Sequence, residues 1–275
     1  MILGQYNDLE ILRFTSVGAY LGDAEDNDVL LPQKCVEPAW EEGDTVTVFI
    51  YKDSEDRIIA TTLKPYIIID EFAYLKVNQV NFFGAFLDWG IEKDLMVPFK
   101  EQQKKLEEDE RVLVYLTLDE STDRLVATTK IGKYLDNDPE HIEVNEPIEV
   151  LICEKHDLGV RVIVENKYPG LIFHNDINKR LIRGSHHTGY VYNKREDGKL
   201  DVRLELEGYD KIEPMSLDLL EIIKKKGGTL YLTDKSDPED IREEIGMSKK
   251  TFKKAVGNLF KQKIISIDKD GITVL

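Results

Sequence analysis

The chain contains two near-copies of one segment, and this repeat limits the folds it can adopt. Residues 46–62 read VTVFIYKDSEDRIIATT, and residues 112–129 read VLVYLTLDESTDRLVATT. The match continues upstream at an offset of 66 residues, where 18–21 (GAYL) corresponds to 84–87 (GAFL). A third, more divergent copy contains 159–162 (GVRV) and 169–173 (PGLIF). A repeat of this length predicts tandem small domains.

Each copy has the pattern of a small β-barrel. Short runs rich in Val, Ile, Thr and Tyr alternate with turn residues, as at 53–56 and 119–123. A glycine in the second strand fits the sharp coil or bulge that closes such barrels. Asp197-Gly198 is a strong hairpin signal in the third copy. Segments 64–72 and 131–147 are interpreted as connectors between the copies.

After Pro214 the hydrophobic period changes from two to about 3.6, which predicts helices. Asp237 followed by Pro238 marks the start of a second helix, and Ser248 is the expected N-cap of a third. Alternating residues around Asp270-Gly271 predict a final hairpin, so the order is that of a winged helix-turn-helix. The predicted buried stripes are Leu217, Leu220 and Ile223, then Ile241 and Ile245, then Phe252, Val256 and Leu259.

The predicted fold class is therefore mostly β with an α/β C-terminal domain. Three tandem small barrels precede the winged helix. The expected domains are residues 1–64, 65–131, 132–213 and 214–275.

Composition points to a cytoplasmic protein. No apolar run reaches the roughly 18 residues needed to span a bilayer, so no membrane association is expected. The first residues lack the pattern of a signal peptide, and Cys35 and Cys153 lie in different copies. The net charge of −16 is uneven: residues 214–275 hold 12 basic and 10 acidic residues, and the rest hold 25 and 43. The acidity thus belongs to the repeats, and only the last domain favours phosphate by charge.

The sequence contains no motif typical of catalysis or metal binding. A Gly-rich phosphate loop, a nucleophile elbow and a His/Cys/carboxylate cluster with metal-ligand spacing are all missing. His174, His186 and His187 are interpreted as structural or as edges of a binding patch, and Cys153 as core. We therefore expect no enzymatic activity and no cofactor.

Three positions recur with constant spacing in the copies. One residue stands just before the glycine, a second three residues later, and a third twelve residues further on. This spacing resembles the OB-fold RNA-binding domain named after ribosomal protein S-one, which places aromatic, aromatic and His there on one exposed patch. The family's closing strand often opens with Arg, as at Arg57 and Arg124 here. The recurring residues are Val17, Tyr20 and Pro32; Phe83, Phe86 and Pro98; and Leu158, Arg161 and Phe173.

Longer strings extend the resemblance to most of the chain. GAFLDWGIEKDLMVPFKEQ, REDGKLDVRLELEGYDKI and SKKTFKKAVGNLFKQ are similar to the conserved virulence factor B (CvfB) family. That resemblance implies three S-one-type domains, a winged helix, and a cytoplasmic bacterial RNA-binding protein that affects gene expression post-transcriptionally. The chain departs from the pattern in having no His at the third position. Phe173 alone keeps an aromatic ring there.

The candidate RNA-binding residues fall into three chemical classes. Aromatic rings would stack on bases, arginines would contact phosphates or stack, and lysines on the third helix would follow the backbone. The alternatives are that the rings pack inside the barrels, the arginines form ion pairs, and the lysines are simply solvated. Phe82 is expected in the core, and Trp89 in either loop packing or the patch. The candidates are Tyr20, Phe83, Phe86 and Phe173; Arg57, Arg124 and Arg161; and Lys249, Lys250, Lys253 and Lys254.

The main functional hypothesis is a regulator that binds single-stranded RNA, with ribosomal or mRNA-associated proteins as further partners. A second hypothesis is a DNA-binding transcriptional regulator that acts through the winged helix. A third is a protein-interaction adaptor whose acidic barrels dock a basic partner.

Overall fold

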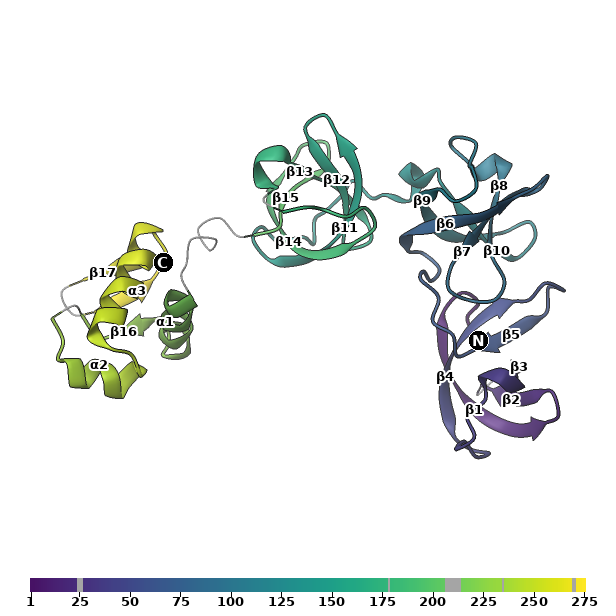
Figure 1. The fold of residues 1–275 in the computed structure, drawn as a ribbon, viewed down its shortest axis with the longest axis horizontal. Coiled ribbons are helices and arrows are strands. Elements are labelled where there is room, and N and C mark those ends of the chain that lie inside the picture. Colours follow the sequence, from purple (N-terminus) through teal and green to yellow (C-terminus); the bar gives the residue numbers. More distant parts are fainter. Residues whose placement is uncertain (24–26, 178, 206–213, 234, 269–270) are drawn as a thin grey trace. The chain divides into compact units, whose positions relative to one another are not determined.

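The computed structural model describes residues 1–275 except 24–26, 178, 206–213, 234 and 269–270. The chain forms two compact units, Met1–Val202 and Arg203–Leu275. The first is built from strands with short 3-10 helices, and the second from helices and a small sheet (Figure 1). The finer boundaries after residues 64, 131 and 213 remain a proposal, and residue 213 lies outside the described part of the chain.

The first copy is a closed five-stranded barrel in the order β1-β2-β3-β5-β4. All pairings are antiparallel except that of β3 with β5, where Leu30 faces Ile59 and closes the barrel. Leu, Ile and Val side chains from alternate strand positions fill its interior. The strands are β1 (Tyr6–Thr15), β2 (Gly18–Gly22), β3 (Asp28–Pro32), β4 (Thr45–Lys52) and β5 (Ile58–Thr61).

The middle copy has the same strand order but a different closure. Its sheet runs β10-β9-β6-β7-β8, and no hydrogen-bonded pairing joins β8 to β10, two strands described in full. These strands nonetheless run side by side, with Met96 and Val126 in the places of Leu30 and Ile59. We call this unpaired β8–β10 contact the seam. The strands are β6 (Phe72–Val80), β7 (Gly84–Asp88), β8 (Leu95–Pro98), β9 (Arg111–Asp119) and β10 (Arg124–Thr128).

The third copy is again a closed barrel, ordered β11-β12-β13-β15-β14. Gly170 and Leu171 pair in parallel with Leu200 and Asp201, and so close it as in the first copy. Gly198 occupies the left-handed region (φ 79°), as the predicted Asp197-Gly198 turn requires. The strands are β11 (Pro147–His156), β12 (Gly159–Val164), β13 (Tyr168–Phe173), β14 (His186–Lys194) and β15 (Leu200–Arg203).

One glycine per copy is required by close backbone approach. Gly18, Gly84 and Gly159 each lie opposite the last residue of the following strand. A Cβ atom there would lie 2.0, 2.3 and 1.9 Å from a carbonyl oxygen of that strand. The repeated glycine is therefore required by close backbone approach, whereas the bulge of the middle copy lies in the preceding strand, between Val77 and Gln79.

The C-terminal unit is the predicted winged helix. Asp237 and Ser248 cap the second and third helices, and each side chain accepts a hydrogen bond from a backbone N–H. Leu217, predicted in the buried stripe, is 39% exposed, because Leu219 fills that core position instead. The predicted hairpin forms, although residues 269–270 of its turn lie outside the described residues. The elements are α1 (Pro214–Lys225), β16 (Thr229–Leu230), α2 (Pro238–Ile245), α3 (Lys249–Lys261), β17 (Ile265–Ile267) and β18 (Ile272–Val274).

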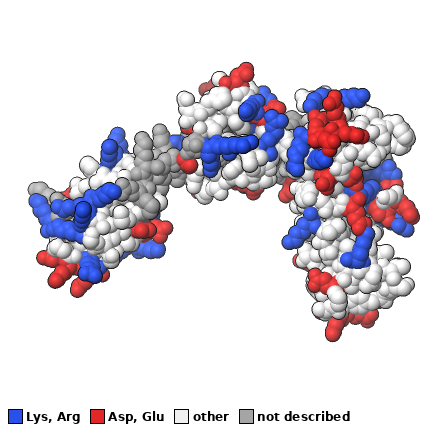
Figure 2. Space-filling model, viewed as in Figure 1, with Lys and Arg blue, Asp and Glu red and all other residues white. Residues whose placement is uncertain are grey.

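Charge is distributed differently in the two units. On the face seen in Figure 2, Lys and Arg are interspersed with Asp and Glu over residues 1–202. On the C-terminal unit acidic side chains lie at α2 and also on the side of α1, whereas basic ones cover the side that carries α3.

Candidate nucleic-acid interface

Two phenylalanines of the middle copy lie on its outer surface. In β7, Ala85 and Leu87 point into the barrel, so Phe86 points outward and is half-buried. Phe83, just before the strand, is 59% exposed. The alternative in which both rings are core residues therefore does not hold. Their role in binding remains a prediction.

The prediction that Phe82 lies in the core is wrong. Its side chain is 80% exposed, and its ring centroid lies 4.1 Å from that of Phe83. The reason is that β7 begins only at Gly84, so the two-residue alternation does not extend back to Phe82. The Asn81 side chain instead accepts a hydrogen bond from the Phe83 N–H (2.9 Å), which fixes a turn that presents both rings.

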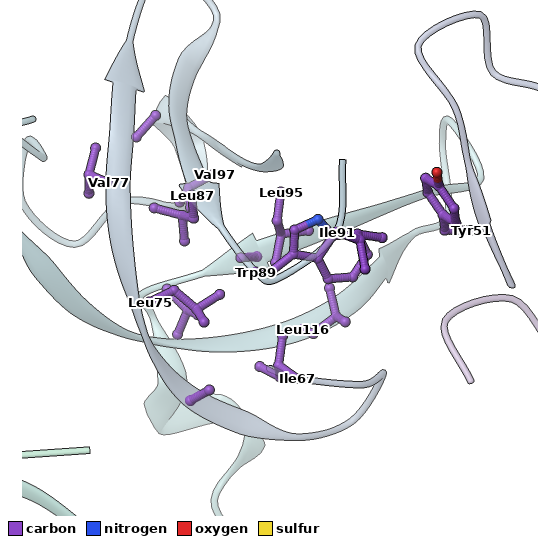
Figure 3. Packing of buried hydrophobic residues seen from close by; sticks show 14 of the residues in the cluster. Tyr51, Ile67, Leu75, Val77, Leu87, Trp89, Ile91, Leu95, Val97 and Leu116 are labelled. Atoms are coloured by element: carbon purple, nitrogen blue, oxygen red, sulfur yellow. The ribbon is translucent and has the colours of Figure 1, made fainter. Parts of the chain in front are cut away.

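Trp89 belongs to a core that the first two copies share. Its side chain is 2% exposed, and its ring meets Phe49 of β4 edge-on at 5.6 Å. The indole N–H donates to the carbonyl of Lys93. Figure 3 shows Trp89 beside Ile91, with Tyr51 of β4 at the edge of the same cluster. Of the two roles considered for Trp89, the structure supports packing.

A pocket of about 380 Å³ opens beside this shared core, and we call it the junction pocket. From the first copy it takes the end of β4 and the following turn, including Tyr51 and Ser54. From the middle copy it takes Phe83, Phe86, Trp89 and both strands of the seam. The lining also holds three cations, Lys52, Lys93 and Arg124, and two carboxylates, Asp56 and Asp94.

Polar contacts tie the two copies together around the pocket. Lys52 donates to the Asp123 carboxylate (2.9 Å) and also to the Asp123 carbonyl. Arg124 forms an ion pair with Asp56. Lys93 donates to the carbonyl of Asp53 at 2.6 Å. The predicted Arg124 is thus held at the junction by a carboxylate.

Burial and these contacts shift the pKa values of the pocket residues. Burial raises the pKa of Tyr51 to about 12. Burial likewise lowers the pKa of the Lys93 ammonium and raises the pKa of the Asp94 carboxyl. The hydrogen bond from Arg124 lowers the pKa of Asp56. The pocket is therefore a partly desolvated place in which electrostatic contacts are stronger than at an open surface.

Tyr20 of the first copy lies on the corresponding outer face but is covered. The Arg13 guanidinium sits 4.0 Å from the centroid of its ring and pairs with Asp28 at 2.8 Å. Val17, in the place of Phe83, is 56% exposed and has no ring. The first copy therefore has one aromatic ring at these positions, and the Arg13 guanidinium already covers a face of that ring.

In the third copy, the predicted residues also make contacts of their own. Arg161 is exposed and pairs with Glu154 at 2.9 Å. Phe173 is half-buried, and the Arg195 guanidinium lies 5.4 Å from its ring centroid. Asp201 holds that arginine through a 2.6 Å hydrogen bond.

Arg57 of the first copy is exposed but already paired. It contacts the carboxylates of Asp53 (2.7 Å) and Glu55 (3.1 Å) within its own turn. The hydrogen bond to Asp53 raises the pKa of Arg57 further. The structure thus brings Phe83, Phe86 and Arg124 to one pocket, whereas Arg57 and Arg161 stand elsewhere.

The four predicted lysines of α3 are not equivalent. Lys249 is half-buried, and its ammonium donates to the carbonyl of Ser236 at 2.7 Å. Lys250, Lys253 and Lys254 are exposed, on the side opposite the buried Phe252 stripe. Lys249 therefore helps to attach α3 to the preceding loop, and the other three form the basic surface.

Sequence reasoning missed the contribution of Tyr51, Lys52, Ser54 and Lys93. They belong to the pocket only because the first copy packs against the middle one. One feature of the sequence pointed to a contact here: Trp89 is a large apolar residue in a loop where the first copy has Asp23. The sequence did not show which residue Trp89 would pack against.

Among the described residues, no three His, Cys, Asp or Glu side chains are grouped so as to hold a metal ion. The described helices are also too short or too polar to cross a membrane.

Comparison with known proteins matches two domain families. The S1 domain matches residues 3–63 and 71–130, and the CvfB-like winged helix domain matches 218–274. Neither is an enzyme family.

Similar proteins cover nearly the whole chain. YitL of Bacillus subtilis is 29% identical over 94% of this chain and 89% of its own length. Conserved virulence factor B of Staphylococcus epidermidis is 24% identical over 99% and 95%. A crystal structure of a multidomain protein with nucleic acid binding domains from Streptococcus pneumoniae is 23% identical, covering 99% of this chain and 98% of that one, with a TM-score of 0.45.

Proposed function

Because the chain belongs to the conserved virulence factor B family of tandem S1-domain proteins with a C-terminal winged helix, we propose that it binds single-stranded RNA and regulates gene expression post-transcriptionally. Its domain content indicates nucleic-acid binding, and the choice of RNA is our proposal. We also propose a cytoplasmic location, no catalytic role, and ribosomal or mRNA-associated protein partners.

The observation that carries the proposal is the outward placement of Phe83 and Phe86 beside Arg124. Unpaired bases stack on such rings with about 1–3 kcal/mol per base and little sequence preference. A duplex hides the faces of its bases, so exposed rings favour single strands. This contact does not depend on net charge, which explains how an acidic chain can bind a polyanion.

The winged helix supplies the complementary electrostatic contact. Lys250, Lys253 and Lys254 form a basic surface with no Arg, Asn or Gln among them, which suits backbone contact better than base-edge readout. Sites linked in one chain raise each other's effective concentration, so affinity should exceed that of either site alone.

Replacing Phe83 and Phe86 together with Ala tests the proposal. Loss of two stacking contacts should weaken single-stranded RNA binding at least about tenfold, since each contributes about 1–3 kcal/mol. Filter binding with the full chain measures it, and a thermal melt checks folding. Phe99→Ala is the matched control, because Phe99 is 45% exposed outside the pocket and should change nothing.

Unchanged affinity in the double variant with a cooperative melt would refute the stacking role. Tighter binding of duplex DNA than of single-stranded RNA of equal length would instead favour the transcriptional regulator.

Replacing Lys250, Lys253 and Lys254 with Gln tests the second contact. The plot of log affinity against log salt concentration should become less steep, by roughly 0.7 for each phosphate that the helix no longer neutralises. Arg at the same three positions keeps the charge and should preserve the slope. An unaltered slope in the Gln variant would show that α3 does not touch the backbone.

A further inference from the structure

We propose that the junction pocket receives one nucleotide, a planar base with its phosphate, enclosed between the first and middle copies. The inference rests on the proposed function, and it goes further by assigning a single-nucleotide site to which the first copy contributes a wall. The shared ligand chemistry is that of a nucleoside monophosphate, whether free or within a strand.

The size of the pocket suits one such unit. Its volume of about 380 Å³ lies near the lower end of the range of about 300–1,000 Å³ found for small-molecule sites. A strand of several nucleotides needs an open groove, whereas this pocket is bounded on one side by the turn that holds Ser54. One nucleotide would enter it, and its neighbours would remain on the outer surface.

The lining has both chemistries that a nucleotide requires. Phe83 and Phe86 supply aromatic surface for a base, and the buried Trp89 lies at the inner wall of the pocket. The side chains lining the pocket include three cations and two carboxylates, in a chain whose net charge is −16. With Asp123, the partner of Lys52, the charges around the pocket balance, so an anion meets less repulsion there than at the acidic surface of the repeats.

Lys93 is the cation best placed for a phosphate. Lys52 and Arg124 each have a carboxylate partner, Asp123 and Asp56. The Lys93 ammonium instead donates to the carbonyl of Asp53, and no carboxylate in the described part of the chain forms an ion pair with it. Burial lowers the pKa of Lys93, and an incoming phosphate would raise it again, because a nearby anion favours the charged ammonium.

The two strands of the seam, β8 and β10, form one wall of the pocket, which we call its floor. Met96 of β8 and Val126 of β10 line it, at positions where the first copy has a closing hydrogen-bonded pair. Because β8 and β10, both fully described, are not joined by ladder hydrogen bonds, this floor can widen without breaking a ladder. The first copy, closed at the same place, has no equivalent freedom.

The chain provides its own probe. It has two tryptophans, Trp40 and Trp89, and Trp89 lines the pocket. In a full-length Trp40→Phe protein, a base stacked in the pocket should quench Trp89 fluorescence. Titration with adenosine monophosphate and with a short single-stranded oligoadenylate compares the free nucleotide with one in a strand.

Ser54→Glu in this background places a carboxylate at the rim without removing a hydrogen bond that holds the junction. We expect it to weaken quenching by either ligand at least about fivefold through charge repulsion. Gln103→Glu adds the same charge at an exposed site of the middle copy outside the pocket and should have no such effect.

Saturable quenching that Ser54→Glu weakens and Gln103→Glu does not would support the proposal. If the oligonucleotide alone quenches, the site accepts a nucleotide as part of a strand; if the monophosphate also quenches, it accepts the free form too. No quenching by either ligand, while filter binding still detects RNA, would overturn the pocket and leave the proposed function standing. No RNA binding in either assay would overturn the proposed function itself.

Discussion

The first and middle copies share one sequence pattern but present different surfaces. The first closes with a β3–β5 pair and covers Tyr20 with Arg13. The middle leaves the seam unpaired and exposes Phe83 beside Phe86. The scaffold therefore fixes where a ring stands, and a few neighbouring side chains decide whether that ring is available.

The largest expected effect is a loss of stability at the glycine that the two copies share. Gly18→Ala and Gly84→Ala should each destabilise the protein by about 3 kcal/mol or more, since the new Cβ would overlap a backbone oxygen at a φ unfavourable to side chains. Urea denaturation measures the free energy of unfolding. Gly132→Ala, with no atom within 4 Å of its Cβ, is the control. A loss below about 1 kcal/mol for Gly84→Ala alone would show that the middle copy relaxes where the first cannot.

Hydrogen exchange examines the difference in closure. The least protected amides of β10 should exchange at least about tenfold faster than those of β5, because the seam lacks ladder hydrogen bonds. Amide exchange followed by NMR resolves the two strands. Equal protection would mean that the seam pairs in solution, and the contrast between the copies would disappear.

The smallest expected effect is on RNA affinity when Tyr20, the ring covered by Arg13, is replaced. Tyr20→Ala should weaken single-stranded RNA binding less than about twofold, since a cation already occupies the ring at a gain of about 0.5–1 kcal/mol. Filter binding compares it with the Phe83/Phe86 double variant. A tenfold loss for Tyr20→Ala would move the principal binding surface to the first copy.

Much of the fold was predictable because it depends on local patterns. The 66-residue repeat and its glycine indicated the barrels, and the caps Asp237 and Ser248 marked the helices. The errors have local causes as well. Phe82 lies in a turn that alternation does not govern, and Leu217 gives way to Leu219 because the helix face is set by packing.

The candidate site was predictable only in part. The resemblance of the spacing to the S-one domain placed Phe83 and Phe86 on an outer face. Strand alternation accounts for Phe86 alone, because Phe83 precedes β7. The spacing did not predict Lys93 or Tyr51 as neighbours, because their proximity arises from packing between the two copies, which local sequence patterns do not specify. The sequence also did not show which of the four α3 lysines makes a structural contact. In the structure it is Lys249, which donates a hydrogen bond to the carbonyl of Ser236.

The core shared by Phe49 and Trp89 has a consequence for how such a chain can evolve. A single copy transplanted into another protein would expose its side of this apolar cluster, and a contiguous exposed apolar patch favours aggregation. We therefore expect genetic recombination to transfer the first two copies together rather than singly.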